Sequence, residues 1–217
     1  MRPPGGFRAV SYHRVTIEAT PRKRRLSRAA RRQIIEEAAS RLFAERGYAA
    51  TTLEDVAGAA GVTKPVLYQH FESKKDLHLT LLAQHRDALL TELAESLAEE
   101  TPLSERIPRV ADAWFSYVER NRYAWAMLFR DTTGDPEVQA FYREMQGTAR
   151  SVLVALIEAE SDLDIRSDRL EPLAELVRSA MTGLALWWWD QAEVEREVVT
   201  AVVVDMLESG LRGVADA

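Results

Sequence analysis

Hydrophobic side chains recur every three to four residues along most of the chain, which is the period of an amphipathic α-helix. The clearest stripe consists of Ile34, Ile35, Ala38, Ala39, Leu42 and Phe43. A second stripe of leucines runs from Leu77 to Leu97 and predicts a helix from about Ser73 to Glu99, roughly 40 Å long. No segment alternates convincingly between apolar and polar residues, so the sequence predicts helices and no sheet.

Two short helices are expected between these long ones. Gly47 is in the place of a C′ glycine and is predicted to end the first helix. The next residues, Thr51-Thr52-Leu53-Glu54, predict a capping box, in which a threonine hydroxyl accepts from the N3 amide and Glu54 reaches back. Gly61 then ends a helix of barely two turns. Thr63 suits the next N-cap and Pro65 falls in the first turn, where its missing N–H costs little.

The rest of the chain continues with helical periodicity. Further helices are predicted near residues 104–119, 121–130, 136–160, 170–190 and 193–212. The expected fold is therefore all-α with about nine helices, a small N-terminal three-helix bundle and a larger C-terminal helical domain. The predicted organisation is a disordered basic arm over residues 1–25, one domain over 26–72 and a second over 73–217.

The net charge of −6 hides a strong asymmetry along the chain. Residues 1–76 carry 15 basic and 8 acidic side chains, a charge of +7, whereas residues 77–217 carry 13 and 26, a charge of −13. A basic end suits a polyanion such as DNA. The run Arg22-Lys23-Arg24-Arg25 belongs to the N-terminal arm. Whether this arm contacts DNA, is an inert tail or results from an upstream start codon stays open.

Composition excludes several classes of protein. There is no cysteine, no apolar run near the roughly 18 residues of a membrane span and no signal-peptide pattern, so we expect a cytoplasmic protein without a membrane partner. Common catalytic motifs are absent. His78 and His85 are seven residues apart and make a poor metal site by themselves. The sequence therefore predicts no enzyme, no catalytic residue, no metal and no cofactor.

The stretch from Thr51 to Lys74 carries the functional signal. Two short helices are joined by a tight turn at Gly61-Val62, and Leu67 and Phe71 are placed to lock the second helix onto the first. This is the pattern of a helix-turn-helix, whose second helix enters the major groove of DNA. The residues not needed for packing face outward; they are Lys64, Val66, Tyr68, Gln69 and His70.

The same stretch resembles the TetR family of transcriptional regulators. The resemblance rests on Gly47-Tyr48, Thr51-Thr52, Val56-Ala57, Gly61-Val62-Thr63-Lys64, Leu67-Tyr68, His70-Phe71, Ser73-Lys74 and Leu77. It covers residues 28 to about 80, beyond which only helix number, length and order agree. It implies DNA contacts by Thr52, Thr63, Lys64, Val66, Tyr68, Gln69, His70 and Lys74.

The resemblance also implies a role for each position. Thr52 would bind a phosphate through its hydroxyl and amide, and Lys64 a phosphate or guanine. Val66 would touch a thymine methyl and Gln69 would pair with adenine. Tyr68 and His70 would clamp phosphates, and Lys74 would grip the backbone from the next helix. For each of these side chains, packing or plain solvation is the alternative.

Large apolar residues dominate the C-terminal part, where the resemblance implies a ligand pocket and a dimer formed by the last two helices. The pocket candidates are Trp114, Phe115, Phe129, Phe141, Met145, Met181 and Trp188. The dimer candidates are Leu184, Val198, Val202, Met206 and Leu207. Three consecutive tryptophans at 187–189 cannot all face one core, because each step turns 100° about a helix. Few charges interrupt these stretches, which favours an apolar or amphipathic effector, fatty acyl or drug-like.

The predicted function is a ligand-responsive repressor that binds a palindromic DNA operator as a homodimer and is released by its effector. A transcriptional activator with the same DNA-binding mode is one alternative. An adaptor that uses the fold to bind protein is the other, and the outward Lys64, Tyr68, His70 and Lys74 argue against it.

Overall fold

The computed structural model describes residues 26–97, 101–129, 135–158, 164–191 and 193–215. The predicted basic arm lies outside these residues. Within them the chain forms nine α-helices and no strand, which confirms the all-α prediction. The helices are α1 (Arg28–Ala50), α2 (Leu53–Ala59), α3 (Lys64–Tyr68), α4 (Lys74–Leu97), α5 (Leu103–Arg120), α6 (Arg122–Phe129), α7 (Pro136–Glu158), α8 (Ser167–Trp189) and α9 (Arg196–Ala215).

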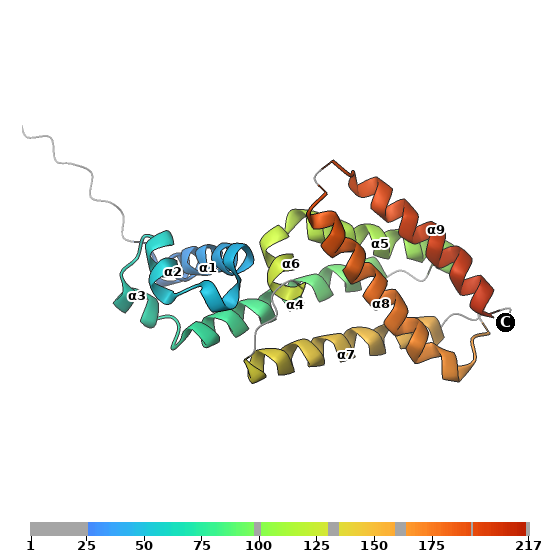
Figure 1. Ribbon diagram of the computed structural model, residues 1–217, viewed down its shortest axis with the longest axis horizontal. Helices are drawn as coiled ribbons and strands as arrows, with labels where there is room; N and C mark the ends of the chain where they lie inside the picture. Colours follow the sequence, from blue (N-terminus) through green and yellow to red (C-terminus); the bar gives the residue numbers. More distant parts are fainter. Residues whose placement is uncertain (1–25, 98–100, 130–134, 159–163, 192, 216–217) are drawn as a thin grey trace, which may run out of the picture.

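Helices α1 to α3 form a small bundle at one end of an elongated molecule, and α4 leads from it into the larger helical body (Figure 1). Ser27 caps α1 by accepting a hydrogen bond from the Ala30 amide at 3.1 Å. Ser73 caps α4 in the same way, accepting from the Asp76 amide at 3.0 Å. These caps satisfy amides that the helix itself leaves unpaired.

Two local predictions need correction. Gly47 breaks the first helix with φ 79° and ψ 163°, but one more helical turn follows it as far as Ala50. The capping box begins one residue later than predicted, with Thr52 as N-cap and Asp55, not Glu54, as its partner. The reason is Thr51, which is fully buried and donates its hydroxyl to the carbonyls of Leu42 and Gly47 at 3.2 and 2.9 Å.

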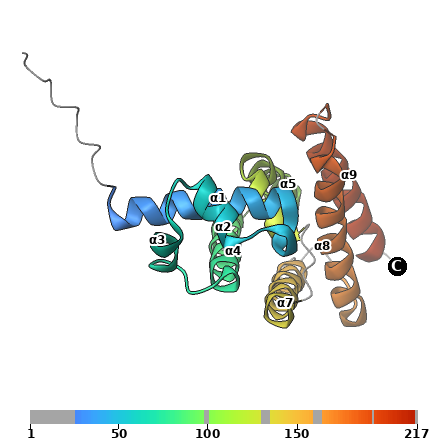
Figure 2. The same cartoon turned by 60° about the vertical axis from the view of Figure 1, so that its left-hand side comes forward.

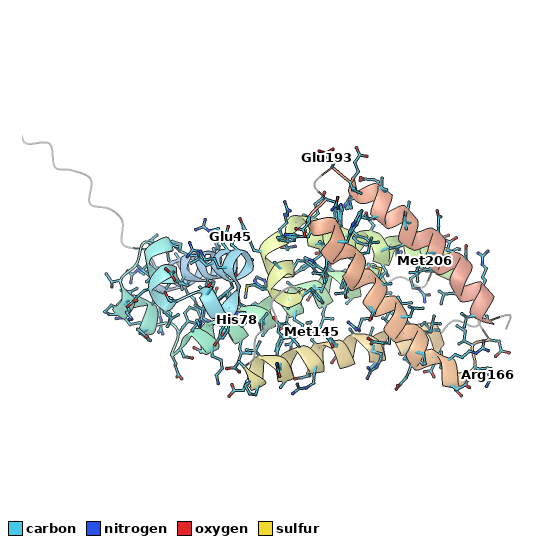
Figure 3. All side chains as sticks on the ribbon, in the orientation of Figure 1. Glu45, His78, Met145, Arg166, Glu193 and Met206 are labelled. Atoms are coloured by element: carbon cyan, nitrogen blue, oxygen red, sulfur yellow. The ribbon has the colours of Figure 1, made fainter. Side chains whose placement is uncertain are left out.

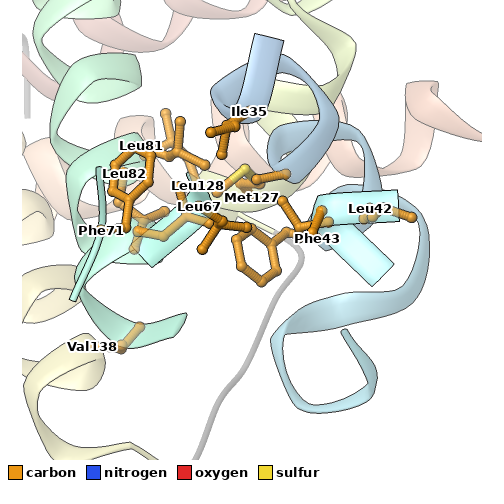
Figure 4. Close-up of a cluster of buried hydrophobic side chains, with 14 of the residues drawn as sticks. Ile35, Leu42, Phe43, Leu67, Phe71, Leu81, Leu82, Met127, Leu128 and Val138 are labelled. Atoms are coloured by element: carbon orange, nitrogen blue, oxygen red, sulfur yellow. The ribbon is translucent and has the colours of Figure 1, made fainter. Parts of the chain in front are cut away.

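The core of the N-terminal bundle extends into the body. Leu67 of α3 and Phe71, three residues after that helix, pack with Phe43 of α1 in one buried cluster. Figure 4 shows that Leu82 of α4 and Met127 of α6 join the same cluster. Because the bundle shares its core with α4 and α6, the body fixes its orientation.

The body is built from two helix pairs around α4 and α6. Helix α5 packs along α9, and α7 packs along α8 (Figures 1 and 2). A second buried cluster centres on Phe115, Trp125 and Ala185. The order of the elements follows the prediction, although helix ends shift by up to three residues, as where α9 begins at Arg196. None of the helices in the described ranges is both long and apolar enough to cross a membrane.

Candidate DNA-reading surface and ligand cavity

The short helix α3 presents most of its side chains to solvent. Leu67 is fully buried and fixes the helix on the bundle, whereas Tyr68 is 48% exposed. Thr63 is at the N-cap position but its hydroxyl makes no capping bond, and Val66 is half-buried. Gln69 is exposed just after the helix. The geometry therefore leaves a hydroxyl, a phenol and an amide accessible to solvent at or beside this short helix.

Lys64, at the first turn of α3, is paired within the protein. Its Nζ donates to Oε1 of Glu54 on α2 at 2.5 Å, and both side chains are largely exposed. The hydrogen bond that Lys64 donates to Glu54, and the negative charge of Glu54, raise the pKa of Lys64. A phosphate that binds Lys64 must therefore replace a carboxylate that already occupies it.

Thr52 is engaged in the same manner. Its amide donates to Oδ2 of Asp55 at 3.0 Å, and its hydroxyl lies 2.6 Å from the same oxygen. The hydrogen bonds from Thr52 hold the pKa of Asp55 below its usual value. The two groups assigned to a phosphate thus hold an anionic oxygen of the protein itself, which shows that they suit an anion.

Lys74 connects the start of α4 to the last turn of α1 and to the residue that follows it. Its Nζ donates to the carbonyls of Tyr48 and Thr51 at 2.9 and 3.0 Å and lies 4.4 Å from the centre of the Tyr48 ring. This position fixes α4 on the bundle. Contact with DNA by Lys74 stays a prediction.

Two arginines that the sequence reading missed support the end of α3. Arg28 and Arg32 of α1 donate to the carbonyls of Gln69 and His70, each at 3.4 Å. Arg32 also lies 4.5 Å from the centre of the Phe71 ring. Burial lowers the pKa of His70, and these neighbouring arginines lower it further. The basic spacing along α1 was the signal that could have revealed them.

His78 lies at the junction of the bundle and the body, near the start of α4 (Figure 3). It is fully buried, and the rings of Phe43 and Tyr48 are each 4.7 Å away. Burial, and to a smaller extent the charge of Lys74, lowers the pKa of His78 to about 4. His85 lies about two turns further along α4. Its Nε2 forms a hydrogen bond with the hydroxyl of Ser40 on α1 at 3.2 Å.

An apolar cavity of about 420 Å³ lies inside the body, within the size range of small-molecule sites. Helices α4, α5, α7 and α8 form most of its wall, and α6 and α9 complete it. Four of the predicted pocket residues line it: Trp114, Phe129, Met145 and Met181. Figure 3 shows the place of Met145 on α7.

The other three predicted pocket residues lie outside the lining. Phe115 is fully buried against Trp188, with ring centres 5.8 Å apart. Phe141 stacks under Arg86 at 5.1 Å. The sequence reading missed two apolar rows that do line the cavity, on α4 and α7; they are Leu89, Leu90, Leu93, Leu97, Val152, Leu153 and Leu156.

An exposed apolar face runs along α9. Val198, Val202 and Met206 follow one another at intervals of four residues, and each is about half exposed. Figure 3 labels Met206 on this helix. The predicted dimer residues Leu184 and Leu207 are instead half-buried, and Leu207 lines the cavity. An apolar row of this kind on a surface is typical of a protein contact.

The three consecutive tryptophans have three different surroundings, as their spacing requires. Trp187 is half exposed on α8. Trp188 packs inward and donates its Nε1 to the carbonyl of Val194 at 2.7 Å. Trp189 lies under Arg122, whose Cζ is 4.8 Å from its ring centre.

Comparison with known proteins matches both parts of this architecture. The family described as "Bacterial regulatory proteins, tetR family" matches residues 34–81, and "Tetracyclin repressor-like, C-terminal domain" matches residues 103–210. The chain belongs to the TetR family. It is a DNA-binding transcriptional regulator of the helix-turn-helix type, and this family consists of regulators and not of enzymes.

Individual TetR-family proteins are similar to this chain over about half of its length or over most of it. The HTH-type transcriptional activator FasR of Mycolicibacterium smegmatis is 29% identical over 88% of this chain and 87% of its own. The transcriptional repressor KstR2 of the same organism is 32% identical over 48% of this chain and 50% of its own. Among solved structures, a TetR-like regulator from Rhodococcus sp. RHA1 has a TM-score of 0.75 at 23% identity, covering 87% of this chain and all of that one. The fatty acid degradation regulator FadR of Bacillus halodurans has a TM-score of 0.71 at 18% identity, covering 84% and 96%.

Proposed function

We propose that this regulator binds a palindromic operator as a homodimer, represses transcription there, and is released by an apolar or amphipathic effector. Residues 26–72 would form the DNA-binding unit and residues 73–217 the ligand-binding and dimerisation unit. The proposal rests mainly on the position of α4. One end of this helix packs into the core of the DNA-reading bundle, and the other end lines the cavity. We also propose a cytoplasmic location, because the DNA lies there.

The test of DNA binding is a salt titration. Fluorescence anisotropy with DNA from upstream of the protein's own gene should give a log affinity that falls by about 0.9 per phosphate contact for each unit of log salt concentration. The double variant Lys64→Ala, Tyr68→Ala should dimerise as the wild type does and lose this binding. A matched control is Arg212→Ala, Tyr123→Ala, which removes exposed side chains from the body. A DNA affinity that does not change with salt concentration would contradict the proposed DNA binding.

The exposed faces of α8 and α9 support a second copy of the chain as their partner. Leu176 and Trp187 are eleven residues apart and so lie on one exposed face of α8, a helix that contacts α9. Two copies related by a twofold axis would cover both faces and place two recognition helices about 34–36 Å apart. Analytical ultracentrifugation should show a dimer for the wild type and a monomer for Val202→Asp, Met206→Asp. Tyr123→Asp, an exposed apolar site outside this face, should remain dimeric.

The effector would act through α4. A molecule seated between Leu93 of α4 and Val152 of α7 would shift the helix that anchors the bundle. It needs only to bind the DNA-free arrangement more tightly, since the coupling is reciprocal. A ligand that fills the cavity without changing operator affinity would contradict this proposal.

An activator is the second candidate, because FasR, which matches across most of the chain, is described as an activator. Deleting the gene separates the two. Transcription of the bound target should rise if the protein represses and fall if it activates, and a reporter fused to the bound DNA measures the direction.

A further inference from the structure

The polar residues that line the cavity are basic or neutral, and none is acidic among the residues that the structure describes. The polar residues in the lining are Arg86, Arg106, Gln146, Thr148, Arg178 and Thr182. No aspartate or glutamate is among the described residues that line it. Asp87 and Glu175, which pair with two of the arginines, are not part of the lining. A cation in this cavity would therefore lose its water without gaining a carboxylate, which is costly.

Two hydrogen-bond donors in the lining have no acceptor. Oγ1 of Thr182 on α8 and Nε1 of Trp114 on α5 are buried, and neither has a hydrogen-bond partner within the described part of the chain. Buried polar atoms are nearly always satisfied, and one left unpaired is destabilising. Two unpaired donors in the wall of an apolar cavity indicate a ligand that carries a hydrogen-bond acceptor.

The cavity opens between α4 and α7. Leu90 and Val152 line it and are also 38% and 45% exposed, so they form its mouth. Arg86 is one turn before Leu90 on the same face of α4, and its guanidinium lies over the Phe141 ring. An entering molecule thus passes an apolar rim whose edge carries the ion pair of Arg86 and Asp87, so the mouth itself favours an apolar group.

Building on the proposed function, we propose that the effector is an apolar chain or ring system that carries a carbonyl or carboxylate and no positive charge. It enters between Leu90 and Val152, and its accepting oxygen takes the hydrogen bonds that Thr182 and Trp114 leave open. The proposal narrows the class of effectors: it excludes cationic drug-like molecules and retains ketones, esters and fatty acids.

Three probes of equal chain length test the charge rule: dodecanoate, dodecan-2-one and dodecylammonium, each below its micelle concentration. Isothermal titration calorimetry on the full chain should show binding of the first two and an affinity at least about tenfold lower for dodecylammonium. Equal or tighter binding of dodecylammonium overturns the proposal. A lack of binding by both oxygen-bearing probes also overturns it. DNA binding by the same sample shows whether the proposed regulator function holds when this inference about the effector fails.

Matched variants test the two donors. Thr182→Val and Thr200→Val each remove a hydroxyl that has no partner in the described chain, but only Thr182 lines the cavity. Thr182→Val should weaken dodecan-2-one about fivefold, the value of one hydrogen bond, while Thr200→Val leaves it unchanged. Trp114→Phe and Trp125→Phe form a second pair of the same design, because both indoles lack partners and only Trp114 lines the cavity. Equal effects within both pairs overturn the assignment of the donors.

Discussion

Mild acid should destabilise this protein through two buried histidines. His78 is fully buried, and neither of its ring nitrogens has a hydrogen-bond partner among the described residues. His85 is mostly buried and touches Ser40. Burial lowers the pKa of each to about 4, and the charged groups that act on His78 are Lys74 and Asp135. Both imidazoles are therefore neutral in the folded protein at neutral pH.

The expected loss of stability follows from proton linkage. In the unfolded chain a histidine has a pKa near 6.5, so between about pH 6.5 and pH 4 the unfolded state binds more protons than the folded state. Stability is therefore lost as the pH falls through this window. Going from about pH 7.5 to about pH 5.5 costs about 1.3 kcal/mol for each histidine by the linkage relation. Because His85 keeps some contact with water, we expect about 2 kcal/mol for the pair.

Urea unfolding at the two pH values measures this loss. The variant His78→Leu should be at least as stable as the wild type at neutral pH, since it removes two unpaired buried nitrogens, and should lose about half as much in acid. The carboxyl groups of Glu175, Asp55 and Glu197 have lowered pKa values, and their ordinary values are 4.5 or below. They therefore affect stability only below about pH 5, outside the interval between the two measurements. A wild type whose stability is the same at both pH values would refute the reasoning, as would a His78→Leu variant that loses as much as the wild type.

Three further predictions concern the DNA-reading bundle. Gly61→Ala should cost about 1–2 kcal/mol in urea unfolding, because Gly61 has φ 64° and an added Cβ meets nothing within 4 Å, which leaves only backbone strain; Gly58→Ala, equally open but inside α2, should not destabilise. Thr51→Val should lower the free energy of unfolding by about 1–3 kcal/mol, since it removes the hydroxyl that the carbonyls of Leu42 and Gly47 accept from. Glu54→Gln should tighten binding to non-specific DNA and steepen its salt dependence by about 0.9, because it frees Lys64 for a phosphate; an unchanged slope would argue against this.

The helix-turn-helix was predictable because its signals are local. Gly61 has the positive φ that the turn demands, and Leu67 and Phe71 are buried as the pattern required. The capping box was one residue out of register because Thr51-Thr52 and Glu54-Asp55 offer the same motif twice. Thr51 is excluded as the N-cap because its hydroxyl donates to two carbonyls of the preceding helix, and this contact is not visible in the local sequence.

The cavity could not be predicted to the same depth. Periodicity identifies the apolar face of a helix but not whether that face meets another side chain or an empty space. The row through Leu89 and Leu93 therefore looked like ordinary core, although it lines the cavity. Phe115 and Trp188 looked equally suited to a ligand and instead pack on each other. The difference is set by how α7 and α8 lie across α4, which depends on contacts far apart in the sequence.

Helix α4 gives the simplest physical link between the two functional parts. Its 24 residues span about 36 Å at 1.5 Å per residue. Leu77 and Leu81 at its start are fully buried in the core of the bundle, and Lys74 donates from that start to two carbonyls at the C-terminal end of α1. Leu93, four turns later, lines the cavity. A displacement at Leu93 is therefore transmitted along one rigid element, and the bundle must move with it or lose its own core contacts. Since α6 also contributes to that core, the pivot for such a motion lies where α4 and α6 meet α1, close to His78 and His85.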